Sequence, residues 1–554
     1  YNLGSDVSHY YNLMISPFIE DTWRPTDALT ILAGVRLDDP YEPQKPDYSS
    51  LFYNNFGFAN NGTGSGNYIF SPRVAFNYTL PTERKTQIRG GVGLVASDYP
   101  VVWYENSFNN AGQLNTVSSG STSTTSGTPT LKFNGNPYIF NGTQSPSLIA
   151  AGAPPSSSAP SFDVMDPKFQ GPSNWKENIA VDHELPFWHI VFTADADFSQ
   201  VNKDIMEQQI NYATPTTGPA YMPDGAIRYA GNITAGSGSA SSGTYTSTYT
   251  ASSSPTDVFL ASTSTSSTAL AEHKAVGPVY YLTNTDKGGS QVYSIYIHRD
   301  MRDGWAWSLG YAHTHSTVVD DAPSTTASTG YSDIYGVNPN DNVAYHSQYA
   351  EPDKVVATLT RRFDFFHNHH AHTSISAQYI AETGQAYSAV FKGDANGDGV
   401  TNSSLFYVPT GPSDPKVAWA SSTDETNFFN WLAKNPEIGQ YAGRVVPRNA
   451  LYAPWVRLLN LHVEQEVPIW GPSHLVLFAD CFDFGNLLNH NWGLVSNFDN
   501  SFNVQTIAGT GFNPAANGGA GQYIYVFNPA TLGTPTTYPD MSRWAIQIGA
   551  RLEF

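Results

Sequence analysis

An all-β fold, in the form of a transmembrane antiparallel β-barrel, is predicted by three features of this 554-residue sequence. Apolar and polar residues alternate along several segments of about 9 to 13 residues, the length with which a tilted strand crosses a bilayer. Short turns and long connections follow one another regularly along the chain. Only 13% of the residues are charged whereas 14% are aromatic, and the chain has no apolar run long enough for a transmembrane helix.

The alternation is clearest in the last twelve residues. One face of this segment is apolar and carries Trp544, Ile546, Ile548, Ala550, Leu552 and Phe554, whereas the other includes Gln547, Gly549, Arg551 and Glu553. The same period of two recurs at residues 29–38, 293–298, 305–312 and 459–464. A barrel in a membrane needs this pattern because lipid meets one face and a wet lumen meets the other. A soluble sandwich or propeller is the alternative, but its strands are usually only about 5 or 6 residues long.

The connections between these strands alternate in length. Short turns are expected near residues 24–28, 81–85, 185–188, 301–304, 364–371 and 468–472, and long segments at 39–66, 98–173, 201–290, 313–353, 384–452 and 485–541. Outer-membrane barrels have short periplasmic turns and long extracellular loops. The long segments are rich in Ser, Thr, Gly and Pro, as at 118–128 and 237–267, and predict loops rather than separate domains. Residues 425–434 predict a short helix within one loop.

Strand parity adds an expectation about the chain as a whole. Six hairpins and one C-terminal strand make about 13 strands, whereas single-chain bacterial barrels have an even number. Counting back from a last strand that ends in the periplasm, the first strand would begin outside the cell. We therefore expect further strands upstream.

Composition also restricts function and the placement of single residues. The net charge of −20 argues against nucleic-acid binding, and the single cysteine, Cys481, excludes an internal disulfide. Cys481 is in phase with Leu475, Leu477 and Ala479, so we expect it to face lipid. Five tryptophans lie near predicted strand ends, where the membrane interface favours them: Trp23, Trp188, Trp470, Trp492 and Trp544. No nucleophile elbow or phosphate-binding loop is present, so no catalytic residue is predicted.

A calcium-like pattern stands at residues 392–409. Asp394, Asn396 and Asp398 would offer side-chain oxygens at every second position, Val400 a carbonyl and Asn402 an amide. The bidentate Glu expected at the twelfth position is replaced by Leu405, and the flanks are not helical, so the segment is no EF-hand. Two interpretations stay open: a loop that binds Ca²⁺ weakly, and a plain turn in which Asp and Asn bond to the backbone. Ca²⁺ is the cofactor that this pattern indicates under the first interpretation.

Two groups of histidines offer weaker metal candidates. The first comprises His367, His369, His370 and His372 in a predicted turn, where strand geometry sends alternate side chains apart. In the second, His313 and His315 precede Asp320 and Asp321 near a loop entrance.

Several stretches resemble the C-terminal barrel of TonB-dependent outer-membrane transporters, in particular the Oar-like branch. The matching stretches are FIEDTWRPTDALTILAGVRLD (18–38), FSPRVAFNYTL (70–80), IRGGVGL (88–94), NWKENIAVDHELP (174–186), GDANGDGVTNSSLFYVP (393–409), NLLNHNWG (486–493) and the terminal strand. The resemblance implies a 22-stranded barrel filled by an N-terminal plug, with a TonB box that couples it to the TonB complex. Residues 1–554 would then be the C-terminal portion of the barrel, corresponding to strands 10 to 22, with the plug and first strands outside this chain.

Two functions from different classes follow. The first is a TonB-dependent transporter in the Gram-negative outer membrane, whose partners are membrane lipid, the TonB complex and a ligand that the sequence does not identify. The second is a structural or adhesive surface barrel without active transport. A plug and TonB box upstream would favour the first function.

Overall fold

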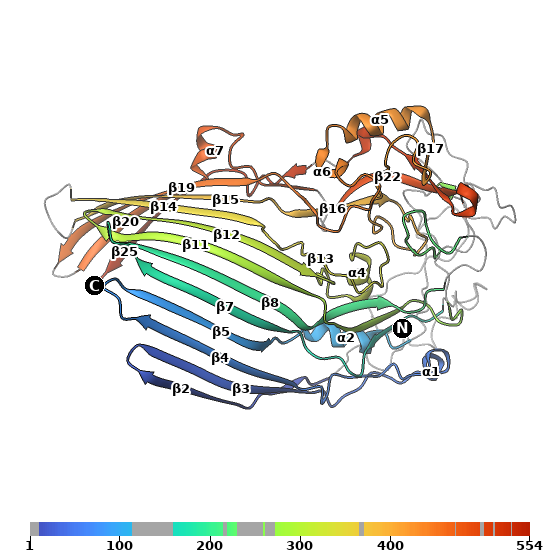
Figure 1. Ribbon diagram of the computed structural model, residues 1–554, viewed down its shortest axis with the longest axis horizontal. Coiled ribbons are helices and arrows are strands. Elements are labelled where there is room, and N and C mark those ends of the chain that lie inside the picture. Colours follow the sequence, from blue (N-terminus) through green and yellow to red (C-terminus); the bar gives the residue numbers. More distant parts are fainter. Residues whose placement is uncertain are drawn as a thin grey trace, which may run out of the picture.

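The computed structural model describes residues 10–112, 159–213, 219–229, 259–260, 272–364, 371–470, 473–498, 504–513, 516–532 and 535–554. Its main body is a curved antiparallel sheet whose long strands run side by side (Figure 1). Thirteen principal strands follow in chain order: β2 (Phe18–Thr26), β3 (Leu29–Tyr41), β4 (Ile69–Leu80), β5 (Thr86–Ala96), β7 (Ser173–Glu184), β8 (Ile190–Gln209), β11 (Gly288–Arg302), β12 (Trp305–Val318), β14 (Asp353–Phe363), β15 (Thr373–Glu382), β19 (Val456–Trp470), β20 (Ser473–Phe482) and β25 (Ala545–Glu553). The predicted all-β architecture and strand number are confirmed.

Each principal strand pairs antiparallel with the next one along the chain. The strand ends that the six short connections join lie at one end of the sheet, and most described elements of the long segments lie at the other, which we call the mouth (Figure 1). The predicted hairpins are therefore confirmed. Two of the described turns contain residues with positive φ: Trp188 and His189 between β7 and β8, and Asp303 (φ 53°) and Gly304 (φ 76°) between β11 and β12.

The strand register aligns the apolar residues of neighbouring strands on one face. Ile295 of β11 lies opposite Tyr311 of β12 and Ala194 of β8, whereas the adjacent Ser294 lies opposite Ala312 and Asp195. Side chains in a strand alternate between the two faces of the sheet. This register therefore places apolar side chains next to one another on the outer face and polar side chains next to one another on the inner face. Cys481 lies opposite Leu461 and Ile546 on the apolar face, as predicted.

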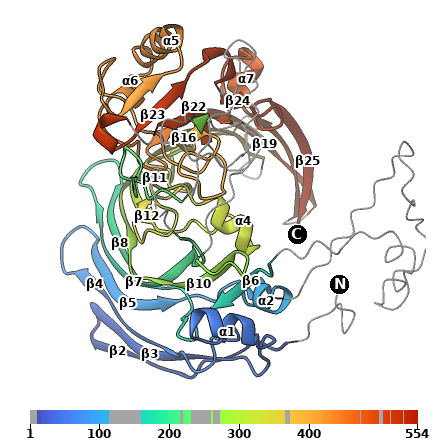
Figure 2. The ribbon, with the colours of Figure 1, turned by 90° about the vertical axis from the view of Figure 1, so that its right-hand side faces the viewer.

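The sheet forms an arc from β2 to β25 (Figure 2). Within the described residues, β2 pairs only with β3 and β25 only with β20, and no pairing joins the two. All nine residues of β2 are exposed. In the described part of the chain, no helix is long and apolar enough to cross a membrane.

Short strands and helices lie at the mouth and pack against or extend the main sheet. The strands are β1 (Leu13–Ile15), β6 (Phe162–Met165), β10 (Val279–Thr285) and β13 (Tyr345–His346), and the helices are α1 (Ser50–Phe56), α2 (Val101–Asn109) and α4 (Ala327–Ser332). The far part of β8, Asp204–Gln209, leaves β11 and pairs with β10, which pairs in parallel with β6. Small apolar cores centred on Phe52, Tyr104 and Phe162 join these elements to the sheet.

The last two long segments, together with β9 (Phe259–Leu260), Met222 and Ala226 of segment 201–290, form a folded body beside the mouth, which we call the cap. It contains the strands β9, β16 (Ala386–Lys392), β17 (Val417–Trp419), β18 (Leu451–Tyr452), β22 (Val504–Asn513) and β23 (Gln522–Val526) in one sheet. Its helices are α5 (Ser422–Leu432) and α6 (Pro436–Gly439). The remaining elements of segment 485–541 are α7 (Phe484–Leu488), β21 (Ser496–Phe498), η1 (Asn517–Gly519), η2 (Pro529–Thr531) and β24 (Pro535–Thr537).

The cap has its own hydrophobic core, with fully buried Phe391, Phe406, Phe428 and Tyr525 at its centre. The helix predicted at 425–434 is confirmed as α5, capped by the Ser421 side chain, which accepts a hydrogen bond from the Asp424 amide. The expectation that long segments are only loops is wrong for 384–452 and 485–541. Neither segment folds alone, but β16 pairs with β22 and β17 with β23, so the two share one core. Segment 118–128, and 237–267 apart from β9, lie outside the described residues.

Candidate functional site: the inner wall and the mouth

The inner face of the barrel is lined by charged side chains from successive strands. Arg89 of β5 donates from Nε to Asp182 Oδ2 of β7 at 3.2 Å, and its Nη2 lies 3.7 Å from Asp195 Oδ2 of β8. Arg73 of β4 likewise forms an ion pair, through Nη2, with Oε2 of Glu20 of β2. Each residue occupies a position between two outward-facing ones, so the alternation of the strands directs these charges inward.

The opposite side of the wall is lined by a second set of pairs. Lys354 Nζ lies 2.7 Å from Glu382 Oε2, and His462 Nδ1 lies 2.7 Å from Asp480 Oδ1. These groups are partly exposed, and such pairs contribute only about 0–1 kcal/mol to stability. Their main consequence is a hydrated inner wall that carries both signs of charge.

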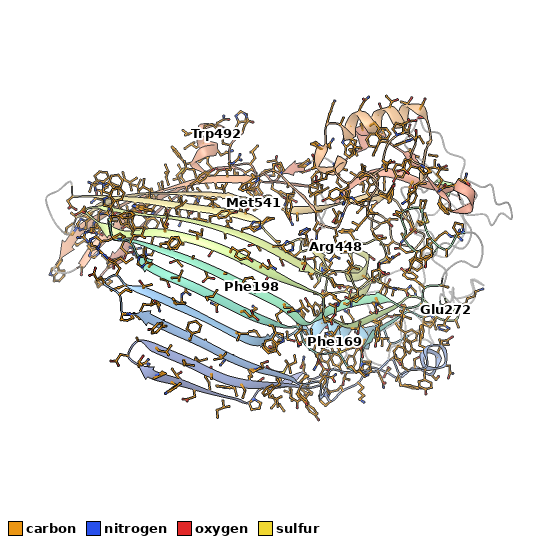
Figure 3. The ribbon with its side chains drawn as sticks, in the orientation of Figure 1. Phe169, Phe198, Glu272, Arg448, Trp492 and Met541 are labelled. Atoms are coloured by element: carbon orange, nitrogen blue, oxygen red, sulfur yellow. The ribbon has the colours of Figure 1, made fainter. Side chains whose placement is uncertain are left out.

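The outer face carries exposed apolar side chains instead. Ile295, Leu309, Leu359 and Ile548 are between 43% and 81% exposed, which is unfavourable in water but natural in contact with lipid. Phe198 projects from the same face of β8 (Figure 3) and its ring lies 5.8 Å from that of Tyr293. The five predicted interface tryptophans are all exposed: Trp23, Trp188, Trp470, Trp492 and Trp544.

The predicted calcium loop is a buried turn at the edge of the cap. Asp394, Asn396 and Asp398 are only 2–3% exposed. Asp394 Oδ1 accepts hydrogen bonds from the amides of Gly397 (2.7 Å) and Asp398 (3.2 Å), and its Oδ2 accepts one from Gly399 (2.9 Å). These are the side-chain-to-backbone bonds of the plain-turn interpretation.

The remaining predicted ligands serve the same turn. Asp398 Oδ1 accepts from the Val400 amide at 2.8 Å, and Asn402 Oδ1 accepts from the Gly393 amide at 2.8 Å. Asn402 adopts φ 59°, a conformation that asparagine tolerates better than most residues. Burial, together with the charge of Asp394, raises the pKa of Asp398 well above its ordinary value. The structure thus brings the five residues into one turn, and Ca²⁺ binding by them stays a prediction.

Replacing Asp394 with alanine should leave the amides of Gly397 and Gly399 without their acceptor, whereas the Asp398 amide keeps its hydrogen bond to Asn396 Oδ1. At about 1–3 kcal/mol for each buried unsatisfied group, we expect the cap to lose several kcal/mol of local stability. Amide hydrogen exchange of residues 393–402 measures this loss. The Asp394→Asn variant keeps one acceptor oxygen and should lose less, whereas equal exchange in both variants would contradict this account of the turn. A Ca²⁺ titration of the same two proteins tests the calcium interpretation.

The structure does not place the described members of the predicted histidine groups around a common metal site. His367, His369 and His370 lie outside the described residues, and His372 bonds to Asp364 through Nδ1 at 2.6 Å. His313 bonds to Asp353, while Asp320 accepts from the amides of Ala322 and Glu207. Among the described residues, no three His, Cys, Asp or Glu side chains converge as a metal site.

Buried carboxyl groups at the mouth form a feature that the sequence did not reveal. Glu207 at the far end of β8 is 6% exposed, and burial, with the charges of Asp320 and Asp163, raises its pKa to about 9. Burial likewise raises the pKa of Asp163 to about 7. Nearby, Arg448 is 2% exposed at the base of the cap (Figure 3) and donates from Nη2 to the carbonyls of Val318 (2.6 Å) and Val319 (2.7 Å).

The chain belongs to the outer membrane beta barrel domain family, whose model matches residues 2–516. The two-faced sheet described above is what this family predicts, and the protein is accordingly a Gram-negative outer-membrane β-barrel. Among curated proteins, no match to the sequence was found.

Solved structures give further similarities. They include the ferric enterobactin receptor PfeA of Pseudomonas aeruginosa in complex with BCV-L6, at 10% identity and a TM-score of 0.41, covering 98% of this chain and 46% of that one. The outer membrane transporter YddB of Escherichia coli matches at 8% identity and a TM-score of 0.40, covering 97% and 45%. The siderophore receptor PirA of Acinetobacter baumannii matches at 9% identity and a TM-score of 0.37, covering 86% and 42%. The chain spans less than half the length of these proteins, which are receptors and a transporter rather than enzymes.

Proposed function

We propose that this chain is the C-terminal part of the barrel of a TonB-dependent transporter of the Oar-like branch. The observation that carries the proposal is the charged inner wall, because a wall of this kind suits a wet lumen through which a ligand passes or in which a polar plug sits. The motif resemblance over residues 18–38, 174–186 and 486–493 supports the same class. The ligand is unidentified.

The unpaired edges of the sheet support strands outside this chain. β2 and β25 would each present backbone N–H and C=O groups to lipid, where an unsatisfied group costs several kcal/mol. Upstream strands that pair with both edges would satisfy these groups and close the barrel with an even strand number. In this proposal residues 1–554 form strands 10 to 22 of the barrel. Strands 1 to 9 precede them in the sequence and close the barrel between β25 and β2, and a plug further upstream carries the TonB box.

A structural or adhesive surface barrel is the second candidate, and the cap favours it. The cap is a cored body rather than a set of separate loops, and it would present a defined surface outside the cell. In this alternative the cap binds a partner and no TonB coupling occurs.

The complete coding sequence and its product distinguish the two candidates. For the transporter we expect a plug and TonB box upstream, and the full-length protein should retain the periplasmic domain of TonB in a pull-down. Deleting the TonB box should abolish retention, whereas a control deletion in another periplasmic segment should not. A product without plug and TonB box would overturn the transporter proposal in favour of the adhesive one.

A further inference from the structure

A small, partly open cavity at the mouth is lined by two carboxyl groups with unsatisfied oxygens. The cavity has a volume of about 10 Å³ and its lining includes Asp163 of β6, Glu207 of β8, and Asn106 and Ser107 of α2. Within the described residues, Glu207 Oε2 and Asp163 Oδ1 are buried and have no hydrogen-bond partner. Buried polar atoms in proteins are almost always paired, so two orphaned oxygens on one cavity require a reason.

Neighbouring charges do not compensate these carboxylates. Among the ion pairs of the described residues, none involves Asp163 or Glu207. The groups that act on Glu207 electrostatically are Asp320 and Asp163, and both are acidic. Asp320 itself is satisfied, because it accepts from the amides of Ala322 (2.8 Å) and Glu207 (3.3 Å). Burial raises the pKa of Asp320 and Arg448 lowers it, whereas the described groups that shift the pKa of Glu207 and Asp163 include no cation.

The cavity is small and only partly enclosed. A side chain added at Gly330 of α4 would collide with Glu207 Oε2, so the helix backbone covers that oxygen directly. A cavity needs about 10–15 Å³ to hold one water molecule, so the space admits a single particle of that size. A bare metal ion fits this limit, whereas a chelate or organic cation does not.

Two neutral polar side chains also line the cavity, beside apolar residues such as Val164, Met165 and Leu282. The amide nitrogen of Asn106 donates to the Thr325 carbonyl at 2.8 Å, which makes its Oδ1 the atom that it can offer to an ion. The Ser107 hydroxyl donates to the Tyr104 carbonyl at 2.7 Å, and its oxygen keeps lone pairs for an ion. Two carboxylates with amide and hydroxyl oxygens are the ligands that hard divalent cations such as Ca²⁺ prefer.

We propose that Asp163 and Glu207, with Asn106 and Ser107, bind one oxygen-coordinated divalent cation of the Ca²⁺ class that fastens the long segments together at the mouth. The site joins α2 and β6 from segment 98–173, β8 from 201–290, and the neighbouring α4 from 313–353. It is separate from the turn at 394–402 and is independent of whether the barrel transports a ligand.

Terbium luminescence on the full-length protein tests the proposal, because Tb³⁺ replaces Ca²⁺ at oxygen sites and Trp103 lines this cavity. With protein stripped by a chelator, tryptophan excitation should give terbium emission that Ca²⁺ competes away. Glu207→Gln and Asp163→Asn should each weaken Tb³⁺ binding at least tenfold. Trp103→Phe should reduce the emission of this site without changing its affinity.

The control variant is Asp394→Asn, which alters the separate turn and should keep the emission from the Trp103 site. Heat-dependent migration on a denaturing gel verifies that every variant is folded. Anomalous diffraction from crystals soaked in Tb³⁺ should show a peak between the carboxylates of Asp163 and Glu207. Unchanged Tb³⁺ binding in both carboxylate variants, no terbium emission from the wild type, or no anomalous peak would overturn the proposal. If the stability of the mouth then depended on pH but not on cations, the two acids would be protonated and would hold no metal ion.

Discussion

Replacing Ile295 with arginine should lower the free energy of unfolding of the barrel by about 2–4 kcal/mol, the cost of a lipid-facing arginine near the bilayer midplane. Ile295 is the central residue of β11, is 50% exposed, and lies between Tyr311 and Ala194 on the apolar face. The guanidinium would replace an aliphatic side chain in the region with the least water. Equilibrium unfolding in lipid vesicles, followed by tryptophan fluorescence, measures the effect.

The matched control for this prediction is Ser294→Arg on the same strand. Ser294 faces the polar wall opposite Asp195, so an arginine there remains hydrated and gains an acidic neighbour. We expect a change within about 1 kcal/mol, as for exposed charges. Equal losses in the two variants, or a larger loss at Ser294, would show that the two faces have been assigned wrongly.

Replacing Phe428 with alanine should destabilise the cap by about 3–5 kcal/mol while leaving the barrel strands intact. Phe428 is 0% exposed, and its ring centroid lies 5.1 Å from that of Trp419 and 5.2 Å from that of Phe527. These contacts join α5 to both long segments of the cap, so the resulting void would weaken their shared core. Amide hydrogen exchange should show faster exchange in β16 and β23.

The neighbouring Phe429 supplies the control, because it is only partly buried at the margin of the same core. Phe429→Ala should have a smaller effect. Exchange in β11 and β12 should be unchanged in both variants. If the barrel strands lost protection together with the cap, the cap would not be a separately cored body.

The strands and turns could be predicted because each long strand has its own local signal. Two-sided strands alternate strictly, as from Tyr293 to His298, and the register then follows from which face meets lipid. β16 lacks this signal, because its seven residues include Tyr387, Val390 and Phe391 in a nearly continuous buried run. Its partner β22 begins more than 100 residues later, so only the folded chain reveals the pairing.

The candidate sites show the same limit. The turn at Asp394 could be found from sequence because its oxygens are spaced locally, and hydrogen bonds from backbone amides to these oxygens were one of the two interpretations that the sequence left open. Asp163 and Glu207 are isolated acids in different long segments, and nothing near either residue in the sequence indicates that they line one cavity. Their proximity depends on the parallel pairing of β6 with β10 and the antiparallel pairing of β10 with β8.

In the proposed arrangement, the strands cross the outer membrane with the cap outside the cell and the short turns in the periplasm. Labelling of single cysteines on intact cells with a membrane-impermeant maleimide, in a Cys481→Ser background, tests this most directly. Asn430→Cys on the exposed side of α5 should be labelled on intact cells, whereas Glu83→Cys in the exposed turn after β4 should be labelled only after the outer membrane is permeabilised. Labelling of Glu83→Cys on intact cells, or protection of Asn430→Cys, would contradict it.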